Sequence, residues 1–394
     1  MSDFGRGLLG LWPLDPSLTY LNHGTVGAPP RRVLAAQRAI RREFHRRPAP
    51  VLLRQLADVG PVAMRERPRM RVAADAVAAF LGARGDDLVF VDNASAGVNS
   101  VLRSLRFEPG DEIVVTDHGY GAVANAVEFV ASRTGARLVT ATLPHPLWRA
   151  DAITGAVLAA VGPRTKLVIV DHVTSPTALV LPVEGIVAGC HARGVPVLVD
   201  GAHAPGALAL DIPALGADWY TANLHKWAMS PISCGILWAP PARQQDLQPL
   251  VVGWGWGRSF TASFDWQGTR DPSPWLAAPA GIEFMRGLGL EAMRAWNHGL
   301  AWGSARRLAE RWKVELPQEE SMVGTMVAVP LPEAFGATGD DAQRIKDALL
   351  FEDSIEVHLQ AMHGRLLWRI SAQVYNDEAD VERATRAIEK RAEA

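Results

Sequence analysis

Seven short apolar runs between residues 87 and 240 restrict the fold of this chain more than any other feature. They are rich in Val and Ile, and several contain almost no polar residue. The runs are 87–92, 111–117, 136–143, 166–173, 195–203, 217–223 and 235–240. Strands that are covered on both faces have such continuous apolar sequences. Because helix-like segments lie between the runs, at 95–106, 120–134 and 184–193, we expect an α/β fold with a mainly parallel sheet and helices on both sides.

The composition of the chain changes after residue 241. Residues 251–275 mix Gly, Trp and polar residues, which predicts a long ordered loop that packs against a partner or ligand. A long helix is expected at about 276–313. A smaller α+β segment should follow, with strands in "MVAVPLP" (326–332) and "RLLWRIS" (365–371) and a final helix at about 377–391.

The length of 394 residues is enough for more than one domain. We expect a large domain at 21–275 and a small domain formed by 1–20 and 276–394. The net charge of −2 gives no reason to expect a nucleic-acid or membrane partner through bulk electrostatics. No apolar run reaches membrane-spanning length, and the first residues do not resemble a signal peptide. We therefore expect a cytoplasmic protein.

The two cysteines, Cys190 and Cys234, suit a reducing compartment. The sequence has no CxxC pair and no Cys/His cluster with the spacing of metal ligands, so we expect no metal site.

Polar residues that follow the predicted strands are the first candidates for chemistry, because ligands of parallel sheets bind beyond the carboxyl ends of the strands. The stretch "VDNASAGVNSVL" (91–102) predicts a strand, a turn of small residues and a helix. The free N–H groups of such a helix start favour an anion, especially phosphate. Ser95 would donate to that anion, although helix capping explains this serine equally well.

Asp200 ends an apolar run in "LVDGAHAPG" (198–206), with His203 three residues later. A buried carboxylate needs a partner, and the N–H group of a cationic ring would serve. Capping of the following turn is the alternative interpretation of Asp200.

Lys226, in "TANLHKWAMSP" (221–231), is one of only five lysines in a chain with 35 arginines. A lysine desolvated beside Leu224 and Trp227 loses its proton more easily, and a neutral amine can form a Schiff base with a carbonyl. The alternative is a side chain that reaches out to water or pairs with an acid.

Taken together, these three features match the needs of pyridoxal 5′-phosphate (PLP). The helix start would anchor the phosphate, Asp200 would keep the ring nitrogen protonated, and Lys226 would hold the aldehyde.

On these residues the chain resembles the class V, fold-type I PLP-dependent enzymes, which include cysteine desulfurases, serine–glyoxylate aminotransferases and isopenicillin N epimerases. It is most similar to the isopenicillin-N-epimerase-like branch. The motifs that carry this resemblance are "YLNHGTVGAPP" (20–30), "VDHVTSPTALVLPV" (170–183), "VDGAHAPG" (199–206) and "NLHKW" (223–227). The resemblance covers nearly the whole chain. It implies a fold-type I transferase with a seven-stranded sheet in the large domain and a homodimer whose active sites are shared across the interface.

The resemblance also implies which residues bind the cofactor. Lys226 would form the internal aldimine and move protons, and Asp200 would pair with the pyridine nitrogen. His118 matches the residue that stacks on the ring, although Tyr120 is close enough to compete. The residues implied near the ring hydroxyl are His203 and Ser175. Those implied at the phosphate are Ala94, Ser95, Asn223, His225 and, from a neighbouring subunit, Thr269.

At the substrate, the resemblance implies that Arg369 grips the α-carboxylate, for which a bidentate guanidinium is well suited. The turn formed by Asn22, His23 and Gly24 would line the pocket beside Tyr120. Arg258, in "GWGWGR" (253–258), is expected to shape the far end of the pocket; its neighbouring tryptophans would fit a dimer interface equally well.

The implied chemistry takes place at Cα of an amino-acid substrate, through an external aldimine and a quinonoid. Residues 235–394 contain no cysteine, which argues against sulfur transfer through a protein persulfide. We expect a C–S lyase that acts on an S-substituted cysteine by β-elimination, since this reaction needs only one base.

Three alternatives remain. Epimerisation or racemisation needs a second acid, for which His23 and Tyr120 are the candidates. Transamination and decarboxylation-linked chemistry come next. The alternative from another class is a catalytically silent PLP-fold protein, and the presence of Lys226, Asp200 and Arg369 argues against it.

Overall fold

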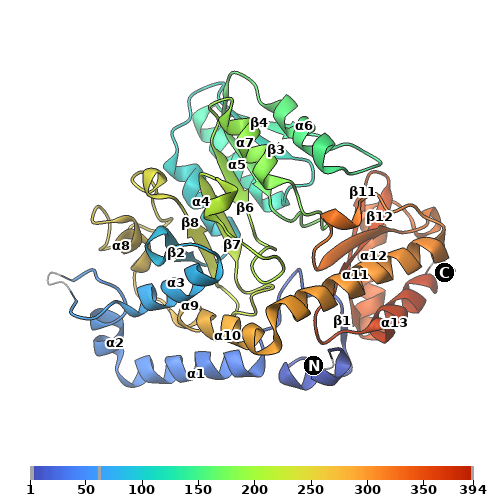
Figure 1. The fold of residues 1–394 in the computed structure, drawn as a ribbon, viewed down its shortest axis with the longest axis horizontal. Coiled ribbons are helices and arrows are strands. Elements are labelled where there is room, and N and C mark those ends of the chain that lie inside the picture. The colour runs from blue at the N-terminus through green and yellow to red at the C-terminus, as the bar shows by residue number, and fades with distance from the viewer. Residues whose placement is uncertain (1–3, 61–63, 392–394) are drawn as a thin grey trace.

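A seven-stranded sheet forms the centre of the computed structural model, which describes residues 4–60 and 64–391 (Figure 1). The strand order is β2-β8-β7-β6-β5-β3-β4, and β8 is the one strand antiparallel to its neighbours in this sheet. The strands are β2 (Leu88–Val91), β3 (Glu112–Thr116), β4 (Arg137–Ala141), β5 (Thr165–Asp171), β6 (Val197–Asp200), β7 (Trp219–Asn223) and β8 (Gly235–Trp238). Each overlaps one of the seven predicted runs, β5 beginning one residue before its run, and the expectation of a mainly parallel sheet is confirmed.

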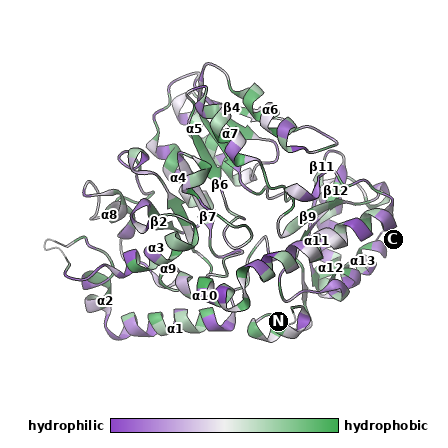
Figure 2. Cartoon of the chain, viewed as in Figure 1, coloured by the Kyte–Doolittle hydropathy of each residue, from purple (hydrophilic) through white to green (hydrophobic). Residues whose placement is uncertain are grey.

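Helices cover both faces of this sheet, and the strand sequences show why. Along β5, Val168 and Val170 pack into one apolar core, whereas Leu167 and Ile169 pack into a second core on the opposite face. Because neither face meets water, no position in the middle of the strand has to be polar. The middle of β5 is accordingly hydrophobic, and Figure 2 shows hydrophobic residues gathered in the large sheet. The helices nearest the sheet are α3 (Arg69–Phe80), α4 (Ala94–Ser104), α5 (Gly121–Thr134), α6 (Ala150–Ala160) and α7 (Val183–His191).

A smaller α+β part contains a three-stranded antiparallel sheet in the order β11-β12-β9 and a two-stranded parallel pair of β1 and β10. Its strands are β1 (Thr19–Tyr20), β9 (Met326–Pro330), β10 (Ile355–Glu356), β11 (His358–Met362) and β12 (Arg365–Ser371). Its helices are α11 (Leu290–Trp312), α12 (Gly339–Asp353) and α13 (Glu378–Glu389). The small C-terminal sheet is confirmed, and the domain boundaries stay a prediction.

Two other expectations need adjustment. The long helix expected at 276–313 is two helices, α10 (Ala278–Leu288) and α11, separated by Gly289. The φ of Gly289 is 89°, a conformation that interrupts a right-handed helix and that glycine adopts at little cost. The expected loop at 251–275 contains α8 (Phe260–Asp265) and the start of α9 (Ser273–Leu276).

Two further helices, α1 (Arg31–Arg46) and α2 (Pro48–Arg54), precede the large sheet in the chain. In the part of the chain that the structure describes, no helix combines the length and apolar character needed to cross a bilayer.

A buried ion pair ties α3 to its neighbours. Arg71 donates to Asp265 Oδ1 at 2.6 Å and to the carbonyls of Gly85 and Leu88 at 3.0 and 2.8 Å. We predict that Arg71→Ala lowers the free energy of unfolding by about 3–5 kcal/mol, because it leaves the carboxylate of Asp265 buried without a partner. Denaturant unfolding followed by circular dichroism measures this loss.

The matched control is Arg67→Ala, two residues before the start of α3. Arg67 pairs with Asp75 and Asp86, but all three side chains are at least 43% exposed. Its loss should therefore cost less than about 1 kcal/mol. Equal losses in the two variants would contradict the assignment of a structural role to the buried pair.

Candidate functional site

A cavity lies at the carboxyl ends of β2, β5, β6 and β7, where the sheet topology predicts a ligand site. Its volume is about 240 Å³, just below the usual range of small-molecule sites (~300–1,000 Å³). Nine residues predicted from the sequence line it: Ala94, Ser95, Tyr120, Ser175, Asp200, His203, Asn223, His225 and Lys226.

Lys226 lies in this cavity, three residues after the end of β7, and its amine is almost fully buried. Burial is the main cause that lowers its pKa to about 7, and the nearby guanidinium of Arg369 lowers it further. The carboxyl groups of Asp200 and Asp171 act in the opposite direction. A large fraction of this amine is therefore neutral at neutral pH, as a nucleophile or base requires.

A hydrogen-bonded chain also favours the neutral amine. Trp227 Nε1 donates to His203 Nδ1 at 3.4 Å, and His203 Nε2 lies 3.1 Å from Lys226 Nζ. Because Nδ1 accepts from Trp227, the ring proton of the neutral imidazole lies on Nε2. That N–H can donate to a neutral amine but not to an ammonium group. Burial and the charge of Lys226 both hold the pKa of His203 well below its usual value.

Asp200 is the last residue of β6 and accepts a hydrogen bond from the Ala202 N–H at 2.9 Å. Its register partner in β5 is Asp171, which also lines the cavity. Burial raises the pKa of both carboxyl groups, and the charge of Asp200 raises that of Asp171 further, well above its usual range. Asp171 is not among the predicted site residues. Its position at the end of the strand next to Asp200 is the sequence signal that points to it.

The start of α4 is arranged as an anion site. Asn93 caps the helix by accepting from the Ala96 N–H at 2.9 Å. The Ala94 N–H donates to Asn223 Oδ1 at 2.8 Å, so the amide NH₂ of Asn223 is free for a ligand. Ser95 lies between Ala94 and Ala96, whose N–H groups are both hydrogen-bonded, and it lines the cavity. Since a helix start carries partial positive charge, this wall favours an anion such as phosphate.

Arg369, on β12 of the small sheet, is only 1% exposed. It donates to the Ser175 carbonyl and to Thr25 Oγ1, both at 2.6 Å, and to Asn22 Oδ1 at 3.3 Å. These acceptors are all uncharged, and burial lowers the pKa of Arg369 to about 10. A buried guanidinium whose protein partners are neutral favours a carboxylate ligand. Thr25, which sequence reasoning missed, lines the cavity and connects it to this arginine.

The structure brings Tyr120, and not His118, to the cavity. Tyr120 is 45% exposed and lies at the start of α5. His118 is fully buried, pairs through Nδ1 with Thr177 Oγ1 at 2.8 Å and packs edge-on against Trp148. The two residues are separated by one glycine in a turn, so their directions cannot be read from the sequence.

The turn at Asn22 to Gly24 lies behind the cavity wall. His23 is fully buried, pairs with the Tyr375 hydroxyl at 2.8 Å and lies 3.2 Å from the Lys226 carbonyl. A Cβ on Gly24 would lie 2.5 Å from Met326 Sδ and 2.9 Å from Ser371 Oγ, so any larger residue here requires these side chains to move. The turn therefore supports the backbone of Lys226 and, through Asn22, the guanidinium of Arg369.

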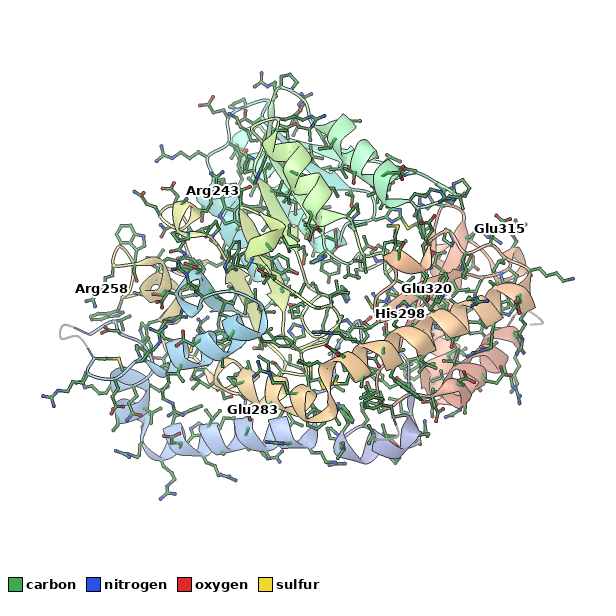
Figure 3. All side chains as sticks on the ribbon, viewed as in Figure 1. Arg243, Arg258, Glu283, His298, Glu315 and Glu320 are labelled. Carbon is green, nitrogen blue, oxygen red and sulfur yellow. The ribbon has the colours of Figure 1, made fainter. Side chains whose placement is uncertain are left out.

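Two predicted residues lie away from this cavity. Thr269 is exposed in the loop between α8 and α9. Arg258 donates to the Gly60 carbonyl at 2.9 Å and lies at the edge of the molecule near α8 (Figure 3). Their expected roles at the phosphate and the substrate stay predictions.

Comparison with known proteins agrees with this geometry. The sequence model of the family described as Aminotransferase class-V matches residues 59–384. An isopenicillin N epimerase from Streptomyces clavuligerus is 34% identical over 95% of this chain and 95% of its own length. A putative L-cysteine desulfhydrase from Oryza sativa subsp. japonica is 32% identical over 95% of this chain and 83% of its own length.

Solved structures share the fold. The cystine C–S lyase C-DES, in complex with its product cysteine persulfide, has a TM-score of 0.75 and 21% identity, covering 95% of this chain and 97% of that protein. A C-DES mutant with glycine covalently linked to the PLP cofactor has a TM-score of 0.73 and 22% identity, covering 95% and 96% of the two chains.

The geometry around Lys226 makes a prediction for the ligand-free chain. The rate at which a small amine-selective reagent modifies Lys226 should rise with pH around a midpoint of about 7. Arg369→Met should raise this midpoint, because it removes a cation that disfavours the ammonium form. Mass spectrometry of the peptide that contains Lys226 measures the pH profile.

Two controls accompany this titration. The exposed Lys166 serves as the reference lysine in the same digest. Arg365→Met, on the same strand as Arg369, should leave the Lys226 midpoint unchanged. A midpoint for Lys226 close to that of Lys166 would contradict the neutral amine.

Proposed function

The chain belongs to the aminotransferase class-V family of enzymes, and from this premise we propose that it binds PLP and cleaves the C–S bond of an S-substituted cysteine by β-elimination. The observation that carries the proposal is the buried, readily deprotonated amine of Lys226 in one cavity with the carboxyl group of Asp200. The relatives named as L-cysteine desulfhydrases and the structure of a cystine C–S lyase support the choice of reaction.

The donor set of the cavity fits this cofactor. Lys226 would hold the aldehyde, Asp200 the ring nitrogen, and the helix start at Ala94 and Ser95 the phosphate. Tyr120 is the aromatic side chain at the cavity that would lie against the ring. When bound, PLP supplies an electron sink that weakens the bonds at the substrate Cα.

The residues of the chain then have separate tasks in the reaction. Arg369 binds the α-carboxylate of the amino acid and fixes its orientation. Lys226 takes the proton from Cα, and the electron pair left behind expels the β-sulfur as a thiolate. Addition of one water to the remaining three-carbon fragment gives pyruvate and ammonia, and the thiolate is released as a thiol.

Both cysteines argue against sulfur transfer through the protein. Cys190 and Cys234 are buried, and burial raises the pKa of both thiols, to about 11 for Cys190. A nucleophilic cysteine needs the opposite shift and access to its substrate. The sulfur therefore leaves as a free thiol.

Epimerisation at Cα is the second candidate, favoured by the 34% identity to an isopenicillin N epimerase. It needs an acid opposite Lys226. His23 is bonded to Tyr375 and fully buried, and burial lowers its pKa to about 4, so it is poorly placed to supply a proton. Tyr120 is exposed to the cavity and is the better candidate for that acid.

We further propose that the chain forms a homodimer in the cytoplasm. The loop after β8 exposes Trp254 (80%) and Trp256 (60%) beside Val251 and Val252. Large apolar side chains gathered on a surface favour a protein contact. The two free cysteines suit a reducing compartment.

Borohydride reduction tests whether Lys226 holds the cofactor aldehyde. Reduction of the PLP-loaded chain with borohydride should attach one pyridoxyl group to the peptide that contains Lys226. Lys226→Ala should lose this attachment, while Lys166→Ala, which removes an exposed lysine on β5, should keep it. Mass spectrometry reads the result, and a pyridoxyl group found on another lysine would overturn the assignment.

The products formed in D₂O distinguish C–S cleavage from epimerisation. With S-alkyl cysteine in D₂O, a C–S lyase should release thiol and pyruvate in equal amounts, and Lys226→Ala should release neither. Chromatography on a chiral column reports the amino acid that remains. Deuterium at an inverted Cα, with no thiol or pyruvate, would favour the epimerase and rule out the lyase.

A further inference from the structure

Asp171 is a buried carboxyl group for which the proposed reaction has no step. It ends β5, is 7% exposed and lines the cavity beside Asp200, its register partner in β6. A Cβ placed on Gly119 would lie 3.5 Å from Asp171 Oδ2, so the carboxyl group lies against the turn that leads to Tyr120. Asp171 therefore lies between Asp200, the proposed partner of the ring nitrogen, and the turn that carries Tyr120.

The groups around this pair carry little positive charge. Lys226 is the cation that acts on both carboxyl groups, and it is readily deprotonated. His172, the residue after Asp171, is neutral because burial lowers its pKa to about 4, and its Nδ1 pairs with the Tyr220 hydroxyl at 3.0 Å. From the turn after β3, the Tyr120 backbone N–H faces Asp171 and brings no charge.

Two adjacent buried carboxylates with so little countercharge cannot both stay ionised, because like charges in a poorly solvated site repel strongly. One proton is therefore retained by the pair. The N–H groups of Asp171 itself and Tyr120 lie near the Asp171 carboxyl group, but of the two carboxyl groups it is Asp200 that accepts a short hydrogen bond in the described residues, from the Ala202 N–H at 2.9 Å, so the proton belongs on Asp171. The stronger upward shift of the Asp171 pKa agrees with this order.

We propose that Asp171 stays protonated beside an ionised Asp200 and acts as a positioning residue for the ring nitrogen of the cofactor. Its role toward the cofactor rests on the proposed function. The pair then presents a single negative charge, which matches one protonated ring nitrogen. A second negative charge would in addition favour the ammonium form of Lys226, so that less of the neutral amine would be present at neutral pH.

The test uses the ligand-free full chain, so that it does not depend on activity. An infrared difference spectrum, wild type minus Asp171→Asn at pH 7, should contain the C=O band of a protonated carboxyl group. The pH midpoint of Lys226 modification should move down by about one pH unit or more in Asp200→Asn, and by less than about 0.3 in Asp171→Asn. Circular dichroism checks that the variants are folded, and Asp171→Ser replaces Asp171→Asn if the amide prevents folding.

The infrared and titration results test the protonated Asp171, and the dialysis tests its role toward the cofactor. A carboxylate band in the difference spectrum, or an equal downward shift of the Lys226 midpoint in the two Asn variants, would overturn the protonated Asp171. Equilibrium dialysis with PLP forms the second arm, in which Asp200→Asn should weaken binding more than Asp171→Asn. Failure of the wild-type chain to bind PLP would remove the proposed function and leave the infrared result standing.

Discussion

The desolvation of one amine is the constraint on which this site depends. Lys226 is withdrawn from water at the end of β7, and the energetic cost of a charge there is what makes the amine a base at neutral pH. The residues around Lys226 support the neutral form of this amine. Trp227 orients His203, His203 meets the amine without a charge of its own, and His23 supports the lysine backbone from behind.

The sequence predicts the large sheet well because its strands are buried on both faces. In the run 166–173 every position after the exposed Lys166 is buried, so the apolar character of the run identifies it as a strand. The small sheet is less regular: the strands at 326–332 and 365–371 are predicted, while β11, with several half-buried side chains, is not. Gly289, which divides the expected long helix, could have been noticed as a helix breaker.

The site is predictable where its residues end strands and unpredictable where it depends on contacts between distant segments. Asp200 and Lys226 follow apolar runs, and Asp171 does too, but its position at a strand end indicates no role by itself. Thr25 is different. It reaches the site because Arg369, 344 residues later, donates to its hydroxyl, and no local pattern encodes that contact. The choice between His118 and Tyr120 depends on the path of a four-residue turn, which the spacing of aromatic residues does not determine.

The position of Arg369 makes the basicity of Lys226 depend on whether a carboxylate is bound. The guanidinium stands on the small sheet and depresses the basicity of an amine on the large sheet. A carboxylate that binds Arg369 compensates its positive charge and so relieves this depression. Lys226 therefore becomes a stronger proton acceptor once an acid-bearing ligand has arrived. Before such a ligand binds, a large fraction of the amine is already neutral at neutral pH and has no proton to release.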